Sequence, residues 1–206
     1  MDDLPELPAQ SFDKQDRGDD LAFYAPPRLV THIDEAAVAA LSRYYAQVVP
    51  AGGVVLDLMS SWVSHLPDEL ALAEVIGHGM NAAELEANPR LSRWFVQDLN
   101  RDPALPLADG SLDAGLACVG VQYLQRPVEV FRDMARVLRP GAPFVVSYAN
   151  RCFPTKAVKI WRSLDMRGQA SLIGRYMERA RFTGIEAEVL SDGSRGDSLV
   201  AVVGRA

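Results

Sequence analysis

The sequence predicts an α/β protein built on one doubly wound, mostly parallel sheet. Short apolar runs alternate with segments of helical periodicity along most of the chain. Strands that alternate with helices form parallel sheets covered by helices on both faces. The runs at 54–58 and 112–121 are apolar at nearly every position, as expected for central strands without a wet face. We therefore expect a seven-stranded sheet with helices on both faces and an antiparallel C-terminal strand.

Each element has its own signal. The first long helix has Asp34 as its cap and stops before Pro50, and another has Pro127 at its start and a stop at Pro140 and Gly141. The last two strands are joined by a polar loop that contains glycine. The predicted helices are residues 34–48, 81–88, 127–142 and 168–182. The predicted strands are residues 54–58, 72–78, 93–97, 112–121, 143–150, 185–192 and 198–205.

Charge divides the chain into a leader and one domain. Residues 1–20 hold seven acidic side chains against two basic ones, whereas the other 186 residues hold 20 acids and 19 bases. We expect residues 1–20 to be an acidic, flexible tail. Residues 21–206 should form a single domain. Within it, residues 21–50 would be an N-terminal lid and helix, and residues 54–206 the core.

Composition argues against several classes of protein. The chain lacks the concentrated Lys and Arg of a nucleic-acid partner. No apolar run approaches the roughly 20 residues that span a bilayer, and the layout of a secretory signal is absent. We therefore expect a cytoplasmic protein that binds no membrane. Two cysteines make no disulfide framework, and three separated histidines lack the spacing of a metal site, so we expect no metal. The oligomeric state stays open.

Polar and aromatic side chains collect where the predicted strands end. In doubly wound sheets the ligand binds outside the carboxyl ends of the strands. These ends are residues 57–61, 78–81, 98–100, 120–123 and 147–152. Tyr123, Asn150 and Cys152 belong to them, and we expect these three residues to face a substrate.

Residues 95–147 carry a series of short motifs in one order. A strand ending at Asp98 is followed by Leu105-Pro106-Leu107, by the turn Asp109-Gly110-Ser111-Leu112-Asp113, and by a helix that closes with Arg136-Val137-Leu138-Arg139-Pro140-Gly141. This order resembles the class I S-adenosylmethionine-dependent methyltransferases of the small-molecule type, and looser agreement extends from Val54 to the end. The resemblance implies a Rossmann-like methyltransferase fold, S-adenosylmethionine as the cofactor and a small molecule as the methyl acceptor.

The resemblance assigns a cofactor-binding role to Asp57 and the loop after it. The family has three glycines in this loop, because the backbone there turns sharply close to the cofactor. This chain has Met59, Ser61 and Val63 at the glycine positions. We expect the hydroxyls of Ser60 and Ser61 to bind the cofactor in place of the missing glycines.

The second and third strand ends differ in how well they match the family. Gly79 stands where the family has an acid that accepts both ribose hydroxyls, and either His78 or Asn81 would make only a single bond instead. We therefore expect weakened or altered cofactor binding. The third strand end keeps its acid. Asp98 would accept from the adenine amine, with Leu99 beside the ring and Met80 on its other face.

The acceptor side is less well defined by the sequence. The resemblance places a substrate lid before the first strand, where Tyr24, Arg28 and His32 would face the acceptor. A general base is needed only if the acceptor arrives protonated, and the candidates for it are His32, Tyr24 and His65. Asp57 could instead cap the turn that follows it, Trp62 beside His65 could be part of the core, and His32 with Asp34 could be a helix-start capping pair.

The missing glycines and the missing acid leave a second interpretation open. The chain would then be a methyltransferase-fold protein with a binding or regulatory role that has lost catalysis, or one that uses another adenine-containing ligand.

Overall fold

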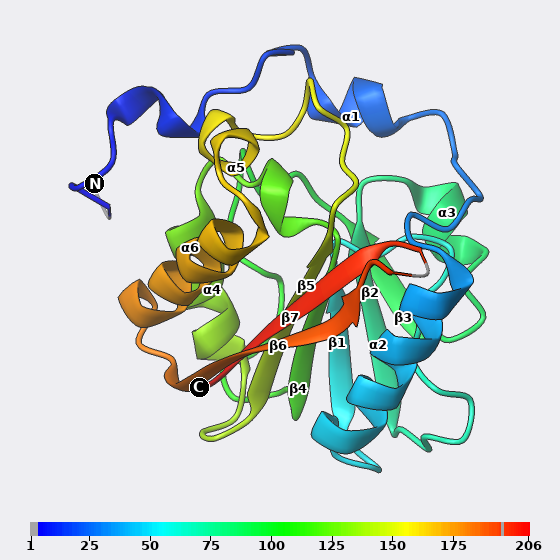
Figure 1. Cartoon of the computed structure of the whole chain (residues 1–206). Coiled ribbons are helices and arrows are strands. Elements are labelled where there is room, and N and C mark those ends of the chain that lie inside the picture. Colours follow the sequence, from blue (N-terminus) through cyan, green and yellow to red (C-terminus); the bar gives the residue numbers. More distant parts are fainter. Residues whose placement is uncertain (1–3, 195) are drawn as a thin grey trace.

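The computed structural model describes residues 4–194 and 196–206, and a seven-stranded sheet forms the centre of this part of the chain (Figure 1). The strand order is β3-β2-β1-β4-β5-β7-β6. Strands β1 to β5 are parallel, and β7 is antiparallel to both β5 and β6. The predicted fold class is confirmed. The strands are β1 Val54–Leu58, β2 Glu74–Gly79, β3 Arg93–Val96, β4 Ala114–Cys118, β5 Pro143–Ala149, β6 Thr183–Asp192 and β7 Ser198–Arg205.

The helices include the four that the sequence predicts and two short ones that it does not. Asp34 caps α2 by accepting from the backbone N–H of Ala37, and Pro127 is the first residue of α4, as expected. The unexpected helices, α1 and α5, have five residues each. The α-helices are α1 Asp20–Tyr24, α2 Glu35–Val48, α3 Ala82–Glu86, α4 Pro127–Val137, α5 Lys159–Ser163 and α6 Met166–Arg179. The 3-10 helices are η1 Ala9–Phe12 and η2 Val121–Tyr123.

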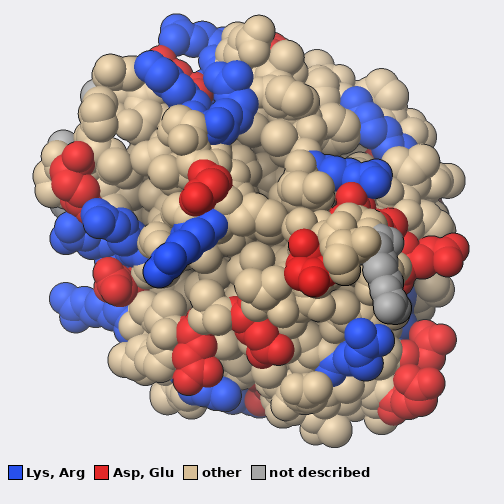
Figure 2. Space-filling model, in the orientation of Figure 1, with Lys and Arg blue, Asp and Glu red and all other residues tan. Residues whose placement is uncertain are grey.

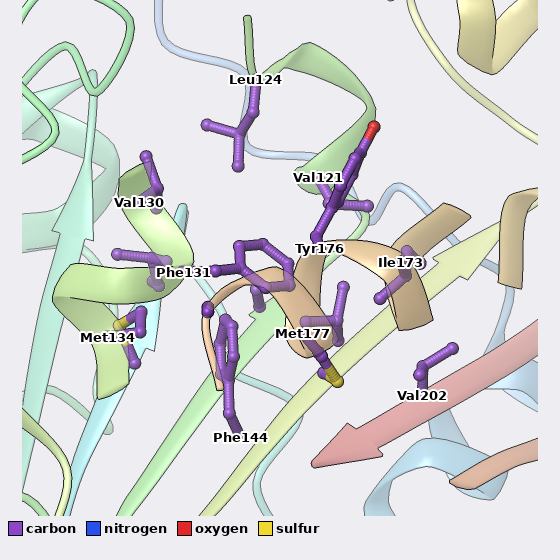
Figure 3. Packing of buried hydrophobic residues seen from close by; sticks show 14 of the residues in the cluster. Val121, Leu124, Val130, Phe131, Met134, Phe144, Ile173, Tyr176, Met177 and Val202 are labelled. Atoms are coloured by element: carbon purple, nitrogen blue, oxygen red, sulfur yellow. The ribbon is translucent and has the colours of Figure 1, made fainter. Parts of the chain in front are cut away.

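The sheet is buried on both faces because its strands are apolar at consecutive positions. Phe144 of β5 points to the face covered by α4 and α6, where it meets Phe131 and Met177 (Figure 3). The next residue, Val145, packs with Leu41 of α2 on the opposite face. This alternation is the period of two that a β-strand imposes on its side chains. It places the core in two layers and leaves the strand ends free to form a site.

The connection between β1 and β2 is irregular. Residues 59–73, all of which the structure describes, contain no helix. A doubly wound sheet usually has a helix at this position, with its N-terminus directed at the ligand. In this chain the loop backbone itself lies at the end of β1.

Residues 4–20 are not a flexible tail, so this part of the prediction is wrong. Leu4 is buried in the core, and the ring of Phe12 lies 6.2 Å from that of Tyr176. The backbone carbonyl of Asp13 accepts from the N–H of Lys159 at 2.9 Å. Two of the acidic side chains that suggested solvation, Asp16 and Asp20, pair with buried lysines, as described below. Residues 1–3 of the expected tail lie outside the described residues.

Charges of both signs are interspersed over the face seen in Figure 2, in agreement with the near-neutral composition of the domain. Among the residues that the structure describes, no helix combines the length and apolar composition that crossing a membrane requires.

Candidate functional site

A cavity of about 330 Å3 lies at the carboxyl ends of β1 to β5. The N-terminal segment with α1, drawn blue in Figure 1, runs across this end of the sheet. The volume falls within the roughly 300 to 1,000 Å3 typical of small-molecule sites. Nearly all the residues assigned a role from the sequence line it: Tyr24, Arg28, His32, Asp57, Ser60, Ser61, His65, Gly79, Met80, Asn81, Asp98, Leu99, Tyr123 and Cys152.

Asn150 is the exception. The chain leaves the sheet after Ala149, and the Asn150 side chain is exposed to solvent and does not line the cavity. Its predicted substrate contact is therefore wrong, although Cys152, two residues later, does line the cavity.

The loop after β1 makes a glycine-type turn without glycine. Met59 has φ +59°, in the left-handed region that glycine usually occupies. Its backbone N–H donates to Nδ1 of His78 at 3.1 Å. Its side chain packs over Gly120, where an added Cβ would lie 2.7 Å from the Cβ of Met59. The methionine is therefore accommodated because a glycine is present on the neighbouring strand end.

The two serine hydroxyls are bonded within the protein. Ser60 Oγ donates to Oδ2 of Asp57 at 2.5 Å, and Ser61 Oγ donates to Oε2 of Glu84 at 2.8 Å. Asn88 donates to the backbone carbonyl of Ser61 at 2.9 Å. Both serines line the cavity, but the structure gives their hydroxyls a role in fixing the loop.

Asp57 lies beneath this loop at the end of β1, with 3% of its surface exposed. Burial raises the pKa of its carboxyl to about 6, and hydrogen bonds from Ser60 and Ser64 act in the opposite direction. Asp57 thus joins the strand end to the loop. It does not cap a helix, because none follows β1.

His78 has no atom free for a ribose hydroxyl and so does not replace the missing acid, whereas Asn81 keeps one lone pair on Oδ1. His78 is 1% exposed, accepts from Met59 and contacts the Gln97 carbonyl through Nε2 at 3.1 Å. Burial lowers its pKa to about 4, which keeps the ring neutral. Asn81 caps α3 by accepting from the Glu84 N–H and donates to the carbonyls of Tyr24 and Ala25.

The end of β3 brings a buried carboxylate and apolar side chains to the cavity. Asp98 is buried, accepts from the Asn100 N–H at 2.9 Å and has the exposed Arg101 at 3.4 Å. Its carboxylate still has acceptor capacity on the cavity side. Leu99, which is 3% exposed, and Met80 add apolar surface to the same wall.

Arg28 is a cation in the N-terminal segment that covers the cavity. Its guanidinium carbon lies 4.8 Å from the ring centre of Phe23 and 5.4 Å from that of Phe153. Its side chain donates to backbone carbonyls, and its backbone N–H donates to Glu84 at 2.6 Å. In residues 4–194 and 196–206, no carboxylate forms an ion pair with its guanidinium.

Besides His78, two further histidines line the cavity, and both are neutral at pH 7. Burial lowers the pKa of His32, while Glu84 raises it and Arg28 lowers it further. Burial and the neighbouring His32 lower the pKa of His65 to about 4. Nδ1 of His65 is buried and has no hydrogen-bond partner in the described part of the chain. Burial holds the pKa of Tyr24 far above its usual range, so Tyr24 can donate a hydrogen bond but cannot act as a base.

Sequence reasoning missed Glu84 and Phe153. Glu84 is buried and joins the lid to the first loop through Arg28 and Ser61. The N-x-x-E spacing from Asn81 to Glu84 is a helix-start signal that could have drawn attention to it. Phe153 contacts four side chains of the roof and opposite wall, and no local pattern indicates this. Among the described residues there is no group of three or more His, Cys, Asp or Glu that could hold a metal ion.

Comparison with known proteins shows what part of the chain is similar to. Residues 60–146 match the family model described as "Methyltransferase domain". An uncharacterized methyltransferase of a Mycobacterium species is 29% identical over 119 residues, which are 55% of this chain and 45% of that protein. The biotin biosynthesis bifunctional protein BioHC of Teredinibacter turnerae is 29% identical over 72 residues, 35% of this chain and 12% of that protein. These matches thus span less than half of either relative.

The solved structures agree with this match at the level of the fold. A SAM-dependent methyltransferase from Archaeoglobus fulgidus superposes with a TM-score of 0.63 over 84% of this chain and 94% of that one, at 15% identity. Its fold is that of the seven-stranded sheet described above. Residues 60–146 thus resemble the methyltransferase domain family, and the chain has the fold of S-adenosylmethionine-dependent methyltransferases.

Proposed function

We propose that the chain binds S-adenosylmethionine in the cavity at the strand ends and transfers its methyl group to a small-molecule acceptor. The observation that carries the proposal is the convergence of Asp98, Leu99 and Met80 on this cavity, which offers a carboxylate and two apolar side chains to an adenine ring. The superfamily match makes S-adenosylmethionine the adenine-containing ligand to expect there.

The residues present fit the adenine end of this cofactor. Asp98 would accept from the exocyclic amine, and Leu99 and Met80 would contact the ring. When bound, the cofactor supplies a methyl group on a positively charged sulfur. The contribution of the chain is to hold the acceptor in line with that group, and positioning alone accounts for much of the rate in such reactions.

The roof of the cavity supports a small acceptor. Tyr24, Arg28 and His32 from the N-terminal segment, together with Phe153, lie over the strand ends and line the cavity. A neutral His65 or His32 can accept a proton from an acceptor hydroxyl or amine, because both keep an uncharged ring at neutral pH. The unpaired charge of Arg28 favours an acceptor that carries an anionic group.

Three measurements test the proposal. Mass spectrometry of small molecules released from the purified protein should detect S-adenosylmethionine or S-adenosylhomocysteine, and calorimetry should show binding of both. The loaded protein should then transfer a labelled methyl group to a compound in the low-molecular-weight fraction of a cell extract. Absence of binding to both ligands would refute the proposal.

A second candidate is a binding or regulatory protein that retains the fold without the chemistry. The observation in its favour is that the first loop uses its serine hydroxyls for its own structure and has no acid at residue 79. Binding of both cofactor forms without label transfer to small molecules would favour this candidate.

A further inference from the structure

The path of the loop after β1 explains why residue 79, at the end of β2, is a glycine and not an acid. A Cβ placed on Gly79 would lie 2.7 Å from the backbone carbonyl oxygen of Ser60 and 3.2 Å from a methyl group of Leu85. Side-chain carbons do not approach a backbone atom so closely. Residue 79 must therefore be glycine as long as the loop follows this path.

His78 holds the loop on this path. Its backbone carbonyl accepts from the N–H of Ser60 at 2.6 Å, and its ring accepts from the N–H of Met59 at 3.1 Å. The two bonds draw the loop onto the end of β2, beside Gly79. His78 thus anchors the loop, and Gly79 leaves the space that the Ser60 carbonyl occupies.

We propose that the Ser60 carbonyl oxygen accepts hydrogen bonds from the ribose hydroxyls of the cofactor, in place of a carboxylate at residue 79. The inference rests on the proposed function. In the described chain this carbonyl accepts from no protein donor, and Ser60 and Gly79 both line the cavity. A carbonyl has two lone pairs, and one left unpaired by the protein can accept from a ligand hydroxyl.

The other polar side chains near residue 79 have hydrogen-bond partners within the protein, unlike the Ser60 carbonyl. The partners of His78 and Asn81 are described above. Glu84 accepts through one oxygen from Arg28 and through the other from Ser61. The position taken by the Ser60 carbonyl is also the position from which a side chain at residue 79 would start. In this chain a neutral carbonyl oxygen therefore lies beside residue 79, where the family resemblance would place a charged carboxylate.

The first test uses the unmodified protein. Calorimetry would compare S-adenosylhomocysteine with its 2′,3′-dideoxy analogue. Hydrogen bonds to a neutral acceptor predict an affinity loss of about twofold to tenfold for the analogue. A loss of a hundredfold or more would mean that a charged group holds the ribose, and it would overturn this inference alone. If S-adenosylhomocysteine itself does not bind, the proposed function fails and this inference fails with it.

The second test changes residue 79. Gly79→Asp introduces the acid found in relatives, but its Cβ must displace the Ser60 carbonyl, so we expect it to weaken S-adenosylhomocysteine binding at least tenfold. Gly174→Ala in α6 is the matched control, because its Cβ meets only Ile185 at 3.8 Å, and binding should be unchanged. A folded Gly79→Asp protein that binds as tightly as the parent, or more tightly, would overturn the inference. If Gly79→Asp does not fold, the analogue comparison decides.

Discussion

Hydrogen bonds to the buried side chains of Asp57 and His78 hold the first loop in a turn for which glycines are the usual choice. A glycine loop needs only room for the backbone. This loop is held by the hydrogen bond from the Ser60 hydroxyl to Asp57 and by the one from the Met59 N–H to His78. Each of these bonds joins the loop to a strand end. Removing one of these hydrogen bonds should lower the free energy of unfolding, even when no ligand is bound.

Ser60→Ala should destabilise the fold. The substitution removes a donor from the Asp57 carboxyl, which is 3% exposed, and leaves that group with one bond fewer. We expect a loss of about 1 to 3 kcal/mol in the free energy of unfolding, measured by urea denaturation at pH 7. Ser163→Ala is the control, since the hydroxyl of Ser163 is exposed and bonds only the carbonyl of Ile160. Equal losses for the two variants would contradict the role given to Ser60.

Asp98→Asn should weaken binding of S-adenosylhomocysteine by about 1 to 3 kcal/mol, because an amide cannot match the charged acceptor offered to the adenine amine. Asp102→Asn serves as the control. Its carboxylate accepts from the Ala104 N–H, is exposed and does not line the cavity. Calorimetry on the two variants gives the comparison, and unchanged affinity in Asp98→Asn would remove this residue from the adenine site.

At the scale of elements, the N-terminal segment is fastened to the domain by buried charges. Nζ of Lys156, with 1% of its side chain exposed, lies 3.0 Å from Oδ1 of Asp20 and 3.1 Å from Oδ2 of Asp16. Lys14, also buried, pairs with Asp20 from the other side. Asp20 lines the cavity, so this ion cluster fixes the start of the roof.

Lys156→Met should weaken the attachment of the N-terminal segment and lower the free energy of unfolding. Removing one partner from a buried ion cluster leaves carboxylate charge without compensation, at a typical cost of about 3 to 5 kcal/mol. The matched control is Arg17→Met, because Arg17 forms an exposed ion pair with Asp13. For this variant we expect the free energy of unfolding to change by about 1 kcal/mol or less. Urea denaturation measures both. A Lys156→Met protein as stable as the Arg17→Met protein would show that the cluster does not hold the segment.

The elements that sequence reasoning found are those with local signals. The apolar runs of β1 and β5 and the caps of α2 and α4 depend on neighbouring residues alone. The order of residues at the strand ends then placed most of the cavity lining correctly. The packing of residues 4–20 against the domain could not be predicted from local patterns, because Asp20 pairs with Lys156, which lies far along the chain.

The roles of individual site residues could be predicted less well than their positions. Ser61 and Asn81 were assigned to the cavity wall from their strand ends, and they do line it. Their hydrogen bonds, however, go to Glu84 and to the lid backbone. Whether such a side chain bonds the protein or a ligand depends on the tertiary structure, and a local sequence pattern carries no information about it.

At the scale of the whole molecule, buried ionisable groups set the pH range of the fold. The pKa values of His65 and His78 fall from the usual 6.5 to about 4 in the folded protein. Between these values the unfolded chain binds a proton on each ring and the folded chain does not. Stability from the two histidines is therefore complete above pH 6.5 and decreases as the pH falls toward 4. The lowered pKa of His32 acts in the same direction.

Asp57 opposes this trend. Its pKa rises from 3.8 to about 6 on folding, so between these values the folded protein binds the extra proton. Its contribution to stability is complete below pH 3.8 and is lost as the pH rises through 6. Between pH 4.5 and 6, His65, His78 and Asp57 together should release about one proton on folding, two from the histidines less the one that Asp57 takes up. The free energy of unfolding should then fall by about 1.4 kcal/mol per pH unit of acidification.

Two single substitutions should change this slope in opposite directions. His65→Asn removes one titrating ring, and asparagine tolerates the φ of +55° at this position, so the dependence on pH should flatten. Asp57→Asn removes the opposing carboxyl while preserving its shape, so the dependence should steepen, to about two protons. Urea denaturation at intervals between pH 4.5 and 7 measures both slopes against that of the parent. If the two variants shift the slope in the same direction, the titrations assigned to these buried groups are wrong, because their signs follow only from which state of the chain binds the proton.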